Sequence, residues 1–289
     1  MSAQLAAGQR FAAPAKVNRC LHVLGRGADG YHRLQTVFQF LDWGDELEIE
    51  AQPEPAISLA GDLSGVAVPD NLAWRAATLL QRAAGVRRGV HIRLFKRIPP
   101  GSGLGGGSSD AATVLCVLNR LWGLHWPLSR LEQLGLELGA DVPVFVRGRA
   151  CIAEGRGEHM QPVELPESAV CVALPAVHCS TAKVFARPEV RRNTARFECS
   201  DWPQAVAQAR NDCLPGALAL YPQLASLEQR LHDCHNNFTM SGTGSAFFCT
   251  MQNREEARTI AGFVKAAGIQ AVVTNLSNVS ALHQAWDQL

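Results

Sequence analysis

Apolar and polar residues alternate in several short stretches of the chain, as they do in half-buried β-strands. This alternation, or a short apolar run, predicts strands at 17–24, 34–41, 46–50, 90–95, 144–146, 150–153, 170–174, 246–250 and 270–274. Apolar residues at helical spacing predict helices at 71–84, 111–122, 129–138, 202–210, 215–220, 225–233 and 255–267. The turn signal Asp29-Gly30 predicts a hairpin between the first two strands. A capping box formed by Ser129 and Glu132 is expected to open the helix at 129.

The order of these elements predicts an α+β fold, because strands and helices mix without the regular spacing of β-α-β units. A length of 289 residues is typical of about two domains. The composition changes near residues 155–159, where glycine and charged residues interrupt the apolar pattern. We therefore predict an N-terminal lobe over residues 1–155 and a C-terminal lobe over residues 156–289.

The segment 99–110, PPGSGLGGGSSD, joins a predicted strand to a predicted helix. Its five glycines allow positive φ angles and leave backbone N–H groups uncovered by side chains. Ser108, Ser109 and Asp110 follow, and all three are good helix N-caps. A glycine loop that leads into a helix N-terminus is a binding site for anions, so the segment predicts a phosphate site.

Three familiar phosphate loops do not fit this segment. A dinucleotide fingerprint needs an acidic residue about 20 positions later, and residues 122–126 read WGLHW. A Walker A loop ends in lysine and serine or threonine, whereas Gly107 leads directly to Ser108. The chain also lacks the lysine strand and H-R-D segment of protein kinases. A nucleotide-phosphate loop of another kind remains, with a flexible linker as the alternative.

Charge and composition narrow the class of protein. Lys plus Arg number 27 and Asp plus Glu 26, and this balance argues against a nucleic-acid partner. The chain has no run of about 18 apolar residues and no apolar core in its first 15 residues, so we expect no membrane partner. The nine cysteines form no C-x-x-C pair, which is typical of reduced thiols in the cytoplasm. We expect a cytoplasmic monomer or weak homodimer.

Two ionisable residues are candidates for chemistry. Lys16 is flanked by Ala15 and Val17, so it is either half-buried and able to neutralise developing charge or an ordinary surface lysine. Asp141 is followed by apolar residues, and a carboxylate buried there would be suited to accepting a proton. The alternative is that Asp141 only caps a helix that starts near Pro143.

Three aromatic residues are candidates for binding a planar ligand. Tyr31 and His32 follow the predicted tight turn, where they can stack on a ring and hydrogen-bond its edge. They fit a half-buried edge strand equally well. From its local sequence alone, Phe185 is expected to be an ordinary core phenylalanine.

Three segments in order resemble the motifs of the GHMP small-molecule kinases: PAKVN at 14–18, PGSGLGGGSS at 100–109 and SGTGS at 241–245. The segments 25–36, 38–42 and 138–145 are similar to one branch of that superfamily. Members of that branch phosphorylate the 2-hydroxyl of a cytidine diphosphate sugar-alcohol ester on the non-mevalonate route to isoprenoids. The resemblance implies an N-terminal lobe like a ribosomal S5 domain, a ferredoxin-like C-terminal lobe and a site between them.

The resemblance also implies roles for individual residues. Asp141 would be the base, Lys16 its electrostatic partner, and ATP with Mg²⁺ the phosphoryl donor. Tyr31 and Phe185 would sandwich the cytosine, His32 would read its edge, and Asn18 would touch the substrate near the acceptor. The nucleotide site would comprise Pro100, Gly101, Ser102, Gly103, Leu104, Gly105, Gly106, Gly107, Ser108, Ser109, Asn71 and Lys96.

Rival functions within the same superfamily stay open. They are a kinase for another alcohol such as homoserine or mevalonate, a diphosphomevalonate decarboxylase and a non-catalytic nucleotide sensor. Tyr31 and His32 argue against the first, and the presence of both Lys16 and Asp141 argues against the sensor. No pattern in the sequence identifies residues that hold the metal.

Overall fold

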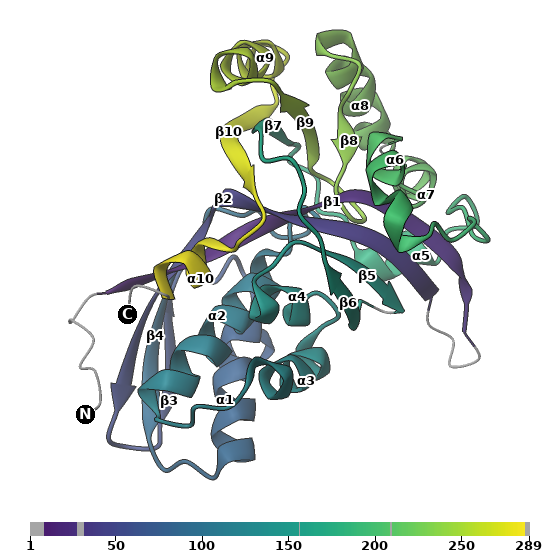
Figure 1. The fold of residues 1–289 in the computed structure, drawn as a ribbon. Helices are drawn as coiled ribbons and strands as arrows, with labels where there is room; N and C mark the ends of the chain where they lie inside the picture. The colour runs from purple at the N-terminus through teal and green to yellow at the C-terminus, as the bar shows by residue number, and fades with distance from the viewer. Residues whose placement is uncertain (1–8, 28–31, 156, 209, 287–289) are drawn as a thin grey trace.

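The computed structural model describes residues 9–27, 32–155, 157–208 and 210–286 (Figure 1). Two long antiparallel strands, β1 (Arg10–Arg26) and β2 (His32–Gln52), run through the middle of the molecule. β2 covers both strands predicted at 34–41 and 46–50, which are therefore one continuous element. No helix among the described residues is long and apolar enough to cross a membrane.

The N-terminal half builds a sheet around β2 and covers it with helices. β4 (Gly89–Phe95) pairs antiparallel with one end of β2, and β3 (Ile57–Gly61) pairs parallel with β4. β5 (Cys151–Gly155) pairs with the other end of β2, and β6 (His159–Pro162) pairs with β5. The helices lie on one side of β1 and β2 in Figure 1; they are η1 (Val68–Asp70), α1 (Leu72–Ala84), α2 (Gly106–Leu121), α3 (Leu128–Leu138) and α4 (Val142–Arg147).

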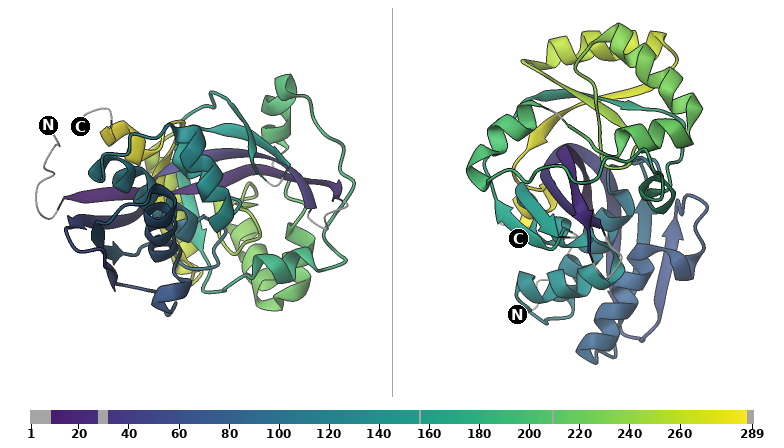
Figure 2. Two further views of the ribbon diagram at one scale, coloured as in Figure 1. Left: turned by 90° about the horizontal axis from the view of Figure 1, so that it is seen from below. Right: turned by 90° about the vertical axis from the view of Figure 1, so that its right-hand side faces the viewer.

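The C-terminal half extends the same sheet on the other side of β1 and β2. β10 (Gln270–Ser277) pairs with β2 and with β7 (Ala169–Leu174), and β9 (Phe247–Met251) and β8 (Thr239–Met240) follow beyond β7. This half also contains α5 (Thr181–Phe185), η2 (Cys199–Asp201), α6 (Trp202–Ala207), α7 (Leu214–Leu220), α8 (Pro222–Cys234), α9 (Arg254–Ala266) and α10 (Ala281–Trp286). The strand order β3-β4-β2-β10-β7-β9-β8 therefore joins the two halves through β10. Figure 2 shows the green and yellow C-terminal half beside the purple β1 and β2 in two further views.

An apolar cluster fills the junction between the halves. It combines Ala15, Val17 and Leu41 from β1 and β2 with Val170, Val172, Phe248 and Leu276 from the C-terminal strands. Ile98, directly before the glycine loop, and Leu104, in the middle of it, are buried in the same cluster. The buried side of the loop thus rests on the core that joins the halves, which fixes the loop relative to both.

Three local predictions are wrong. Residues 144–146 belong to helix α4 and not to a strand, because Pro143 favours the first turn of a helix. A short apolar run does not distinguish a buried strand from a buried helix. The capping box is absent, since α3 begins at Leu128 after Pro127 without a side-chain cap. Helix α2 begins at Gly106, so Ser108, Ser109 and Asp110 lie inside it and do not cap it.

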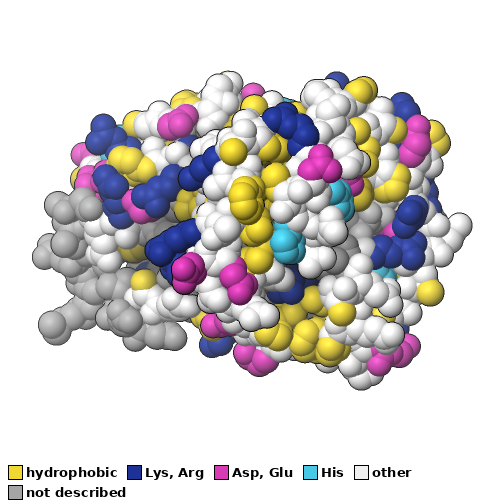
Figure 3. Space-filling model, turned by 90° about the horizontal axis from the view of Figure 1, so that it is seen from above, with side chains coloured by type: hydrophobic (Ala, Val, Ile, Leu, Met, Phe, Trp, Pro, Cys, Tyr) yellow, Lys and Arg dark blue, Asp and Glu magenta, His cyan; other side chains and the backbone are white. Residues whose placement is uncertain are grey.

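Charges of both signs are spread over the described surface seen in Figure 3, where Lys and Arg side chains lie among Asp and Glu. This distribution agrees with the formal net charge of +1. The eight cysteines whose side chains the structure describes are all unpaired. Burial raises the pKa of several of their thiols, among them Cys116 and Cys213, to about 12, so these thiols stay protonated.

Candidate active site

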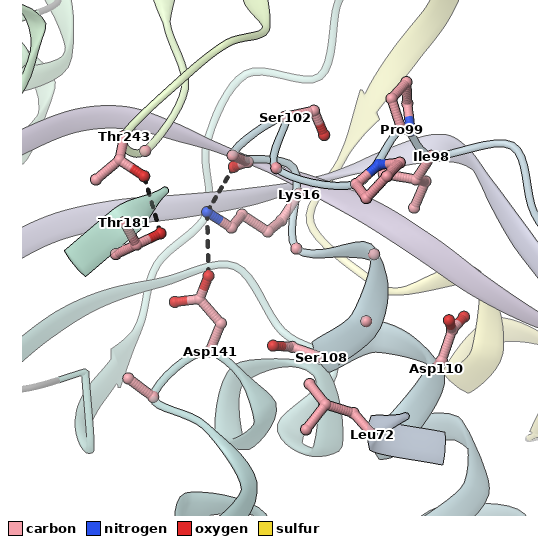
Figure 4. Close-up of a pocket in the computed structure, with 18 of the residues that line it drawn as sticks. Lys16, Leu72, Ile98, Pro99, Ser102, Ser108, Asp110, Asp141, Thr181 and Thr243 are labelled. Atoms are coloured by element: carbon pink, nitrogen blue, oxygen red, sulfur yellow. Dashed lines mark hydrogen bonds and ion pairs between the residues drawn. The ribbon is translucent and has the colours of Figure 1, made fainter. Parts of the chain in front are cut away.

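A cavity of about 450 Å³ lies between the two halves and collects most of the candidate residues. Its walls come from β1, β2, α5, the segments 62–72 and 96–108, the second glycine loop at 241–245 and the two residues directly before α4. Figure 4 shows Lys16 and Asp141 pointing toward each other within it, beside the first glycine loop.

Lys16 reaches this cavity from β1. Irregularities in the pairing of β1 with β2 lie directly before Lys16 and directly after Asn18, and these two residues share one face of the strand. The Lys16 side chain is 3% exposed, so it is buried more deeply than predicted and the alternative of a surface lysine is wrong. Its Nζ donates to Asn18 Oδ1 at 2.6 Å and to the Gly103 carbonyl at 2.9 Å.

The third partner of Lys16 is Asp141. Lys16 Nζ forms an ion pair with Asp141 Oδ2 at 3.3 Å, in addition to its hydrogen bonds to Asn18 and Gly103. Asp141 occupies the N-cap position of α4 but makes no side-chain cap bond, because its carboxylate turns to Lys16. The side chain is 36% exposed, so the predicted burial is wrong and the carboxylate is open to the cavity. An oriented carboxylate of this kind can accept a proton from a bound hydroxyl.

The first glycine loop ends in an uncapped helix. Gly101, Gly103 and Gly105 have φ angles of 66°, 77° and 78°, which side chains rarely adopt. A Cβ on Gly103 would lie 2.2 Å from the Ser241 carbonyl oxygen, so this glycine allows the two loops to touch. Gly105 is the N-cap of α2 and provides no side chain to its first N–H groups. Those N–H groups are left for an anion.

The second glycine loop supports the first. Ser241 Oγ donates to the Gly103 carbonyl at 3.0 Å and accepts from the Asn18 backbone N–H at 3.2 Å. The backbone N–H groups of Ser245 and Ala246 donate to the carbonyls of Gly101 and Ser102. The C-terminal half therefore holds the glycine loop against β1.

Lys96 lies in a charged cluster at the other end of the cavity. Its Nζ pairs with the carboxylates of Asp45 and Asp110, and Asp45 also accepts the backbone N–H groups of Arg97 and Ile98. Burial, together with the neighbouring Asp45, raises the pKa of Asp110 to about 7 even though Lys96 opposes the shift. Asp110 Oδ1 is buried with no partner among the described residues. The cluster joins the strand that enters the loop to the helix that leaves it.

The structure brings Phe185 and His32 together. Their rings stack with centroids 4.9 Å apart, and Phe185 also lines the cavity. Arg192 Nε donates to His32 Nε2 at 3.2 Å, and its other N–H groups donate to the carbonyls of Phe185, Arg187 and Val190. Burial and the nearby arginine charges lower the pKa of His32, which favours a neutral imidazole. Tyr31 lies outside the described residues.

The remaining predicted nucleotide residues divide into two groups. Asn71 lines the cavity and caps α1, since its Oδ1 accepts from the Ala73 N–H at 3.0 Å. Leu104 and Ser109 are buried and are not among the described residues that line the cavity. Every other predicted loop residue lines it: Pro100, Gly101, Ser102, Gly103, Gly105, Gly106, Gly107 and Ser108.

Sequence reasoning missed Thr36, Asp45 and Asp110 as parts of this site. Thr36 lies on β2 inside a predicted strand, and its hydroxyl accepts from the Asn18 amide at 2.9 Å. Asp45 and Asp110 meet Lys96 from positions 51 and 14 residues away, and no local pattern reports that contact. Asp45 lies between Gly44 and Glu46 and outside both strands predicted in this region, so no pattern marked it.

Comparison with known proteins places this site in a family. Residues 71–149 match the model of the GHMP kinases N terminal domain. The chain is 45% identical over 280 residues to the 4-diphosphocytidyl-2-C-methyl-D-erythritol kinase of Pseudomonas paraeruginosa, covering 96% of this chain and 97% of that one. A crystal structure of 4-(cytidine 5'-diphospho)-2C-methyl-D-erythritol kinase superposes with a TM-score of 0.77 at 37% identity, covering 93% of this chain and 99% of that one.

More distant structures share the fold. Homoserine kinase from Cytophaga hutchinsonii is 17% identical with a TM-score of 0.67, and the match covers 94% of each chain. At this identity the likeness concerns the fold alone. The predicted α+β GHMP kinase fold is confirmed by these comparisons.

Proposed function

Since this chain belongs to the 4-diphosphocytidyl-2-C-methyl-D-erythritol kinase family of the GHMP kinases, we propose that it transfers the γ-phosphoryl group of ATP to the 2-hydroxyl of 4-diphosphocytidyl-2-C-methyl-D-erythritol. The observation that carries this proposal is the Lys16–Asp141 ion pair, which faces the same cavity as the uncapped start of α2. The Asp141 carboxylate is suited to accept a proton, and the free N–H groups at the start of α2 are suited to bind phosphates.

Phosphoryl transfer depends mainly on positioning and on neutralising charge. In our proposal the first glycine loop and the N-terminus of α2 bind the ATP phosphates, and Asp141 faces the acceptor hydroxyl. The hydroxyl oxygen forms a bond to the γ-phosphorus while the bond to the ADP oxygen breaks. The hydroxyl proton passes to Asp141. Lys16 holds that carboxylate in place through the ion pair.

The family implies Mg²⁺, and the oxygen atoms of the cavity fit a shared rather than a dedicated metal site. Within the described parts of the chain, no three His, Cys, Asp or Glu side chains gather as a metal site. Mg²⁺ is commonly held by one or two protein oxygens together with substrate phosphates. The Ser108 hydroxyl and the Asp141 carboxylate line the cavity and would supply such oxygens. The ion would neutralise phosphate charge there.

The cytidine group belongs to the side of the cavity lined by Phe185. The phenyl ring carries His32 on one face, so a pyrimidine would stack on the part of the ring that the cavity exposes, or displace the imidazole. Tyr31 as the second wall, and a lobe boundary near residue 155, stay predictions.

The purified protein incubated with ATP and Mg²⁺ tests this function. The acceptor panel is 4-diphosphocytidyl-2-C-methyl-D-erythritol, the same alcohol without its cytidine diphosphate group, homoserine and mevalonate. We expect ADP release and a new phosphate ester only with the cytidine diphosphate substrate. Turnover of homoserine or mevalonate at a comparable kcat/KM would assign the chain to another GHMP activity, and ATP binding without turnover of any acceptor would favour a nucleotide sensor.

A further inference from the structure

A chain of buried hydrogen bonds runs behind Lys16, from β1 to β2 and back. Lys16 Nζ donates to Asn18 Oδ1, and Asn18 Nδ2 donates to Thr36 Oγ1 at 2.9 Å. The Thr36 hydroxyl donates in turn to the Cys20 carbonyl at 2.6 Å. Lys16, Asn18 and Thr36 are each at most 3% exposed, yet all three reach the wall of the cavity.

The chemistry of the two ends fixes the direction of every bond in this chain. The Cys20 carbonyl can only accept, so the single hydrogen of the Thr36 hydroxyl points to it. Thr36 Oγ1 is then an acceptor for Asn18, and it must receive the amide NH₂ group. The ammonium of Lys16 can only donate, so it requires the amide oxygen. Both ends therefore demand the same orientation of the Asn18 amide.

This orientation has two consequences in the cavity. Asn18 Oδ1 and the Gly103 carbonyl each accept a hydrogen bond from Lys16, and the ammonium group also forms an ion pair with Asp141. The amide nitrogen has a second hydrogen that no described residue accepts. Since Asn18 lines the cavity, that hydrogen can be donated to the oxygen of a bound hydroxyl while Asp141 takes its proton.

We propose that Thr36 is a positioning residue for phosphoryl transfer, which anchors the Asn18 amide with its oxygen toward Lys16 and its free N–H toward the acceptor oxygen. This inference rests on the proposed function, because it assumes a hydroxyl acceptor beside Asp141. Without the Thr36 hydroxyl, Lys16 alone holds the amide, and the amide plane can rotate about that single contact. Small misplacements of positioning groups are costly to the chemical step.

The test compares Thr36→Val, which keeps the shape and removes the hydroxyl, with Thr36→Ser, which keeps the hydroxyl. We expect Thr36→Val to lower kcat about 5- to 100-fold with the KM for ATP within about twofold of wild type. Thr36→Ser should retain at least about half of the wild-type kcat. Thr36→Ala removes the same hydroxyl and replaces Thr36→Val if that variant does not fold.

Thr113 provides a matched control. It is also buried, and its hydroxyl likewise donates to a β1 carbonyl, that of Ala12 at 3.1 Å, but it is not among the described residues that line the cavity. Thr113→Val should lower the melting temperature by an amount similar to Thr36→Val and leave kcat unchanged. Equal losses of kcat in the two variants would reduce Thr36 to a structural role and overturn the proposal.

A double-mutant cycle shows whether Thr36 acts through Asn18. In an Asn18→Ala background, Thr36→Val should change kcat by less than about twofold, because the group that it positions is gone. If the double variant instead loses kcat by the product of the two single losses, the proposal is contradicted. The ¹H–¹⁵N signal of the Asn18 side-chain amide gives a readout without substrate: Thr36→Val should shift it and speed its exchange with water, while Thr113→Val should not. If Thr36→Val leaves this signal unchanged, Thr36 does not orient the Asn18 amide, whichever alcohol is the acceptor.

Discussion

Replacing Gly107 by alanine should weaken ATP binding while leaving the fold intact. Gly107 lies in the first turn of α2, lines the cavity and has none of the positive φ angles found at Gly101, Gly103 and Gly105. A Cβ there would meet only Leu72 Cδ1 at 3.5 Å, an ordinary van der Waals contact. Alanine is favoured over glycine in helices by up to about 1 kcal/mol, so stability should hold or rise.

The other glycines of this loop are poorer probes. A Cβ at Gly103 would collide with a backbone oxygen, one at Gly105 would lie 2.8 Å from the Phe145 ring, and one at Gly106 would lie 3.0 Å from Ile98. Substitution at these positions would disturb the fold together with the ligand. Gly107 separates the two effects, because its new methyl group has only the cavity to enter.

The size of the effect follows from the bond that the methyl group would block. Side chains at the start of a helix point toward its N-terminus, where the phosphates are proposed to lie. A hydrogen bond to a charged group contributes about 1.5–3 kcal/mol. Its loss should raise the dissociation constant for ATP roughly 10- to 150-fold.

Calorimetric titration with ATP measures this change, and thermal unfolding checks the fold. Gly262→Ala is the matched control, because Gly262 lies in α9 with nothing within 4 Å of its Cβ position. That variant should bind ATP as the wild type does. A Gly107→Ala protein that unfolds normally and binds ATP within about twofold of wild type would refute the assignment of this loop to phosphate.

Two further predictions concern the base and the charged cluster. Phe185→Ala should raise the KM for the cytidine substrate roughly 5- to 150-fold and leave the KM for ATP unchanged, because stacking on a base contributes about 1–3 kcal/mol per aromatic residue; a parallel rise in both KM values in steady-state assays would mean that Phe185 only packs the cavity wall. Asp110 has a pKa raised from 3.8 to about 7, so the folded protein binds a proton there that the unfolded chain releases between these pH values. As the pH rises from 4 to 7, this group should therefore lower the free energy of unfolding by at most about 1.4 kcal/mol per pH unit. In urea titrations, Asp110→Asn should reduce this dependence on pH. An equal dependence on pH in both proteins would contradict a raised pKa of Asp110.

The parts of the site that the sequence predicts are those with a local pattern. The glycine loop, its strand and its helix follow from composition and spacing, and Lys16 and Asn18 share a face because they are two residues apart on a strand. Asp141 is marked by its apolar neighbours, although the structure leaves its carboxylate open to the cavity. The site residues that could be predicted are thus those whose positions follow from the local course of the backbone.

Contacts between distant segments are the parts that it does not predict. Thr36 meets Asn18 only because β1 and β2 pair in one register, and Lys96 meets Asp45 and Asp110 only after the loop closes. The strand predicted at 144–146 failed for a related reason. An apolar run of three residues fits a strand or a fully buried helix, and tertiary packing decides between them.

The rate of the chemical step in an Asp141→Asn protein tests the account most directly. The substitution keeps the size of the side chain and removes its ability to accept a proton. Rapid-quench single-turnover assays with saturating ATP and 4-diphosphocytidyl-2-C-methyl-D-erythritol should show a rate about 10²- to 10⁴-fold below wild type, with the dissociation constant for ATP nearly unchanged. A rate above about half of the wild-type value would contradict the role of Asp141 as the base and return it to the start of α4 as a structural residue.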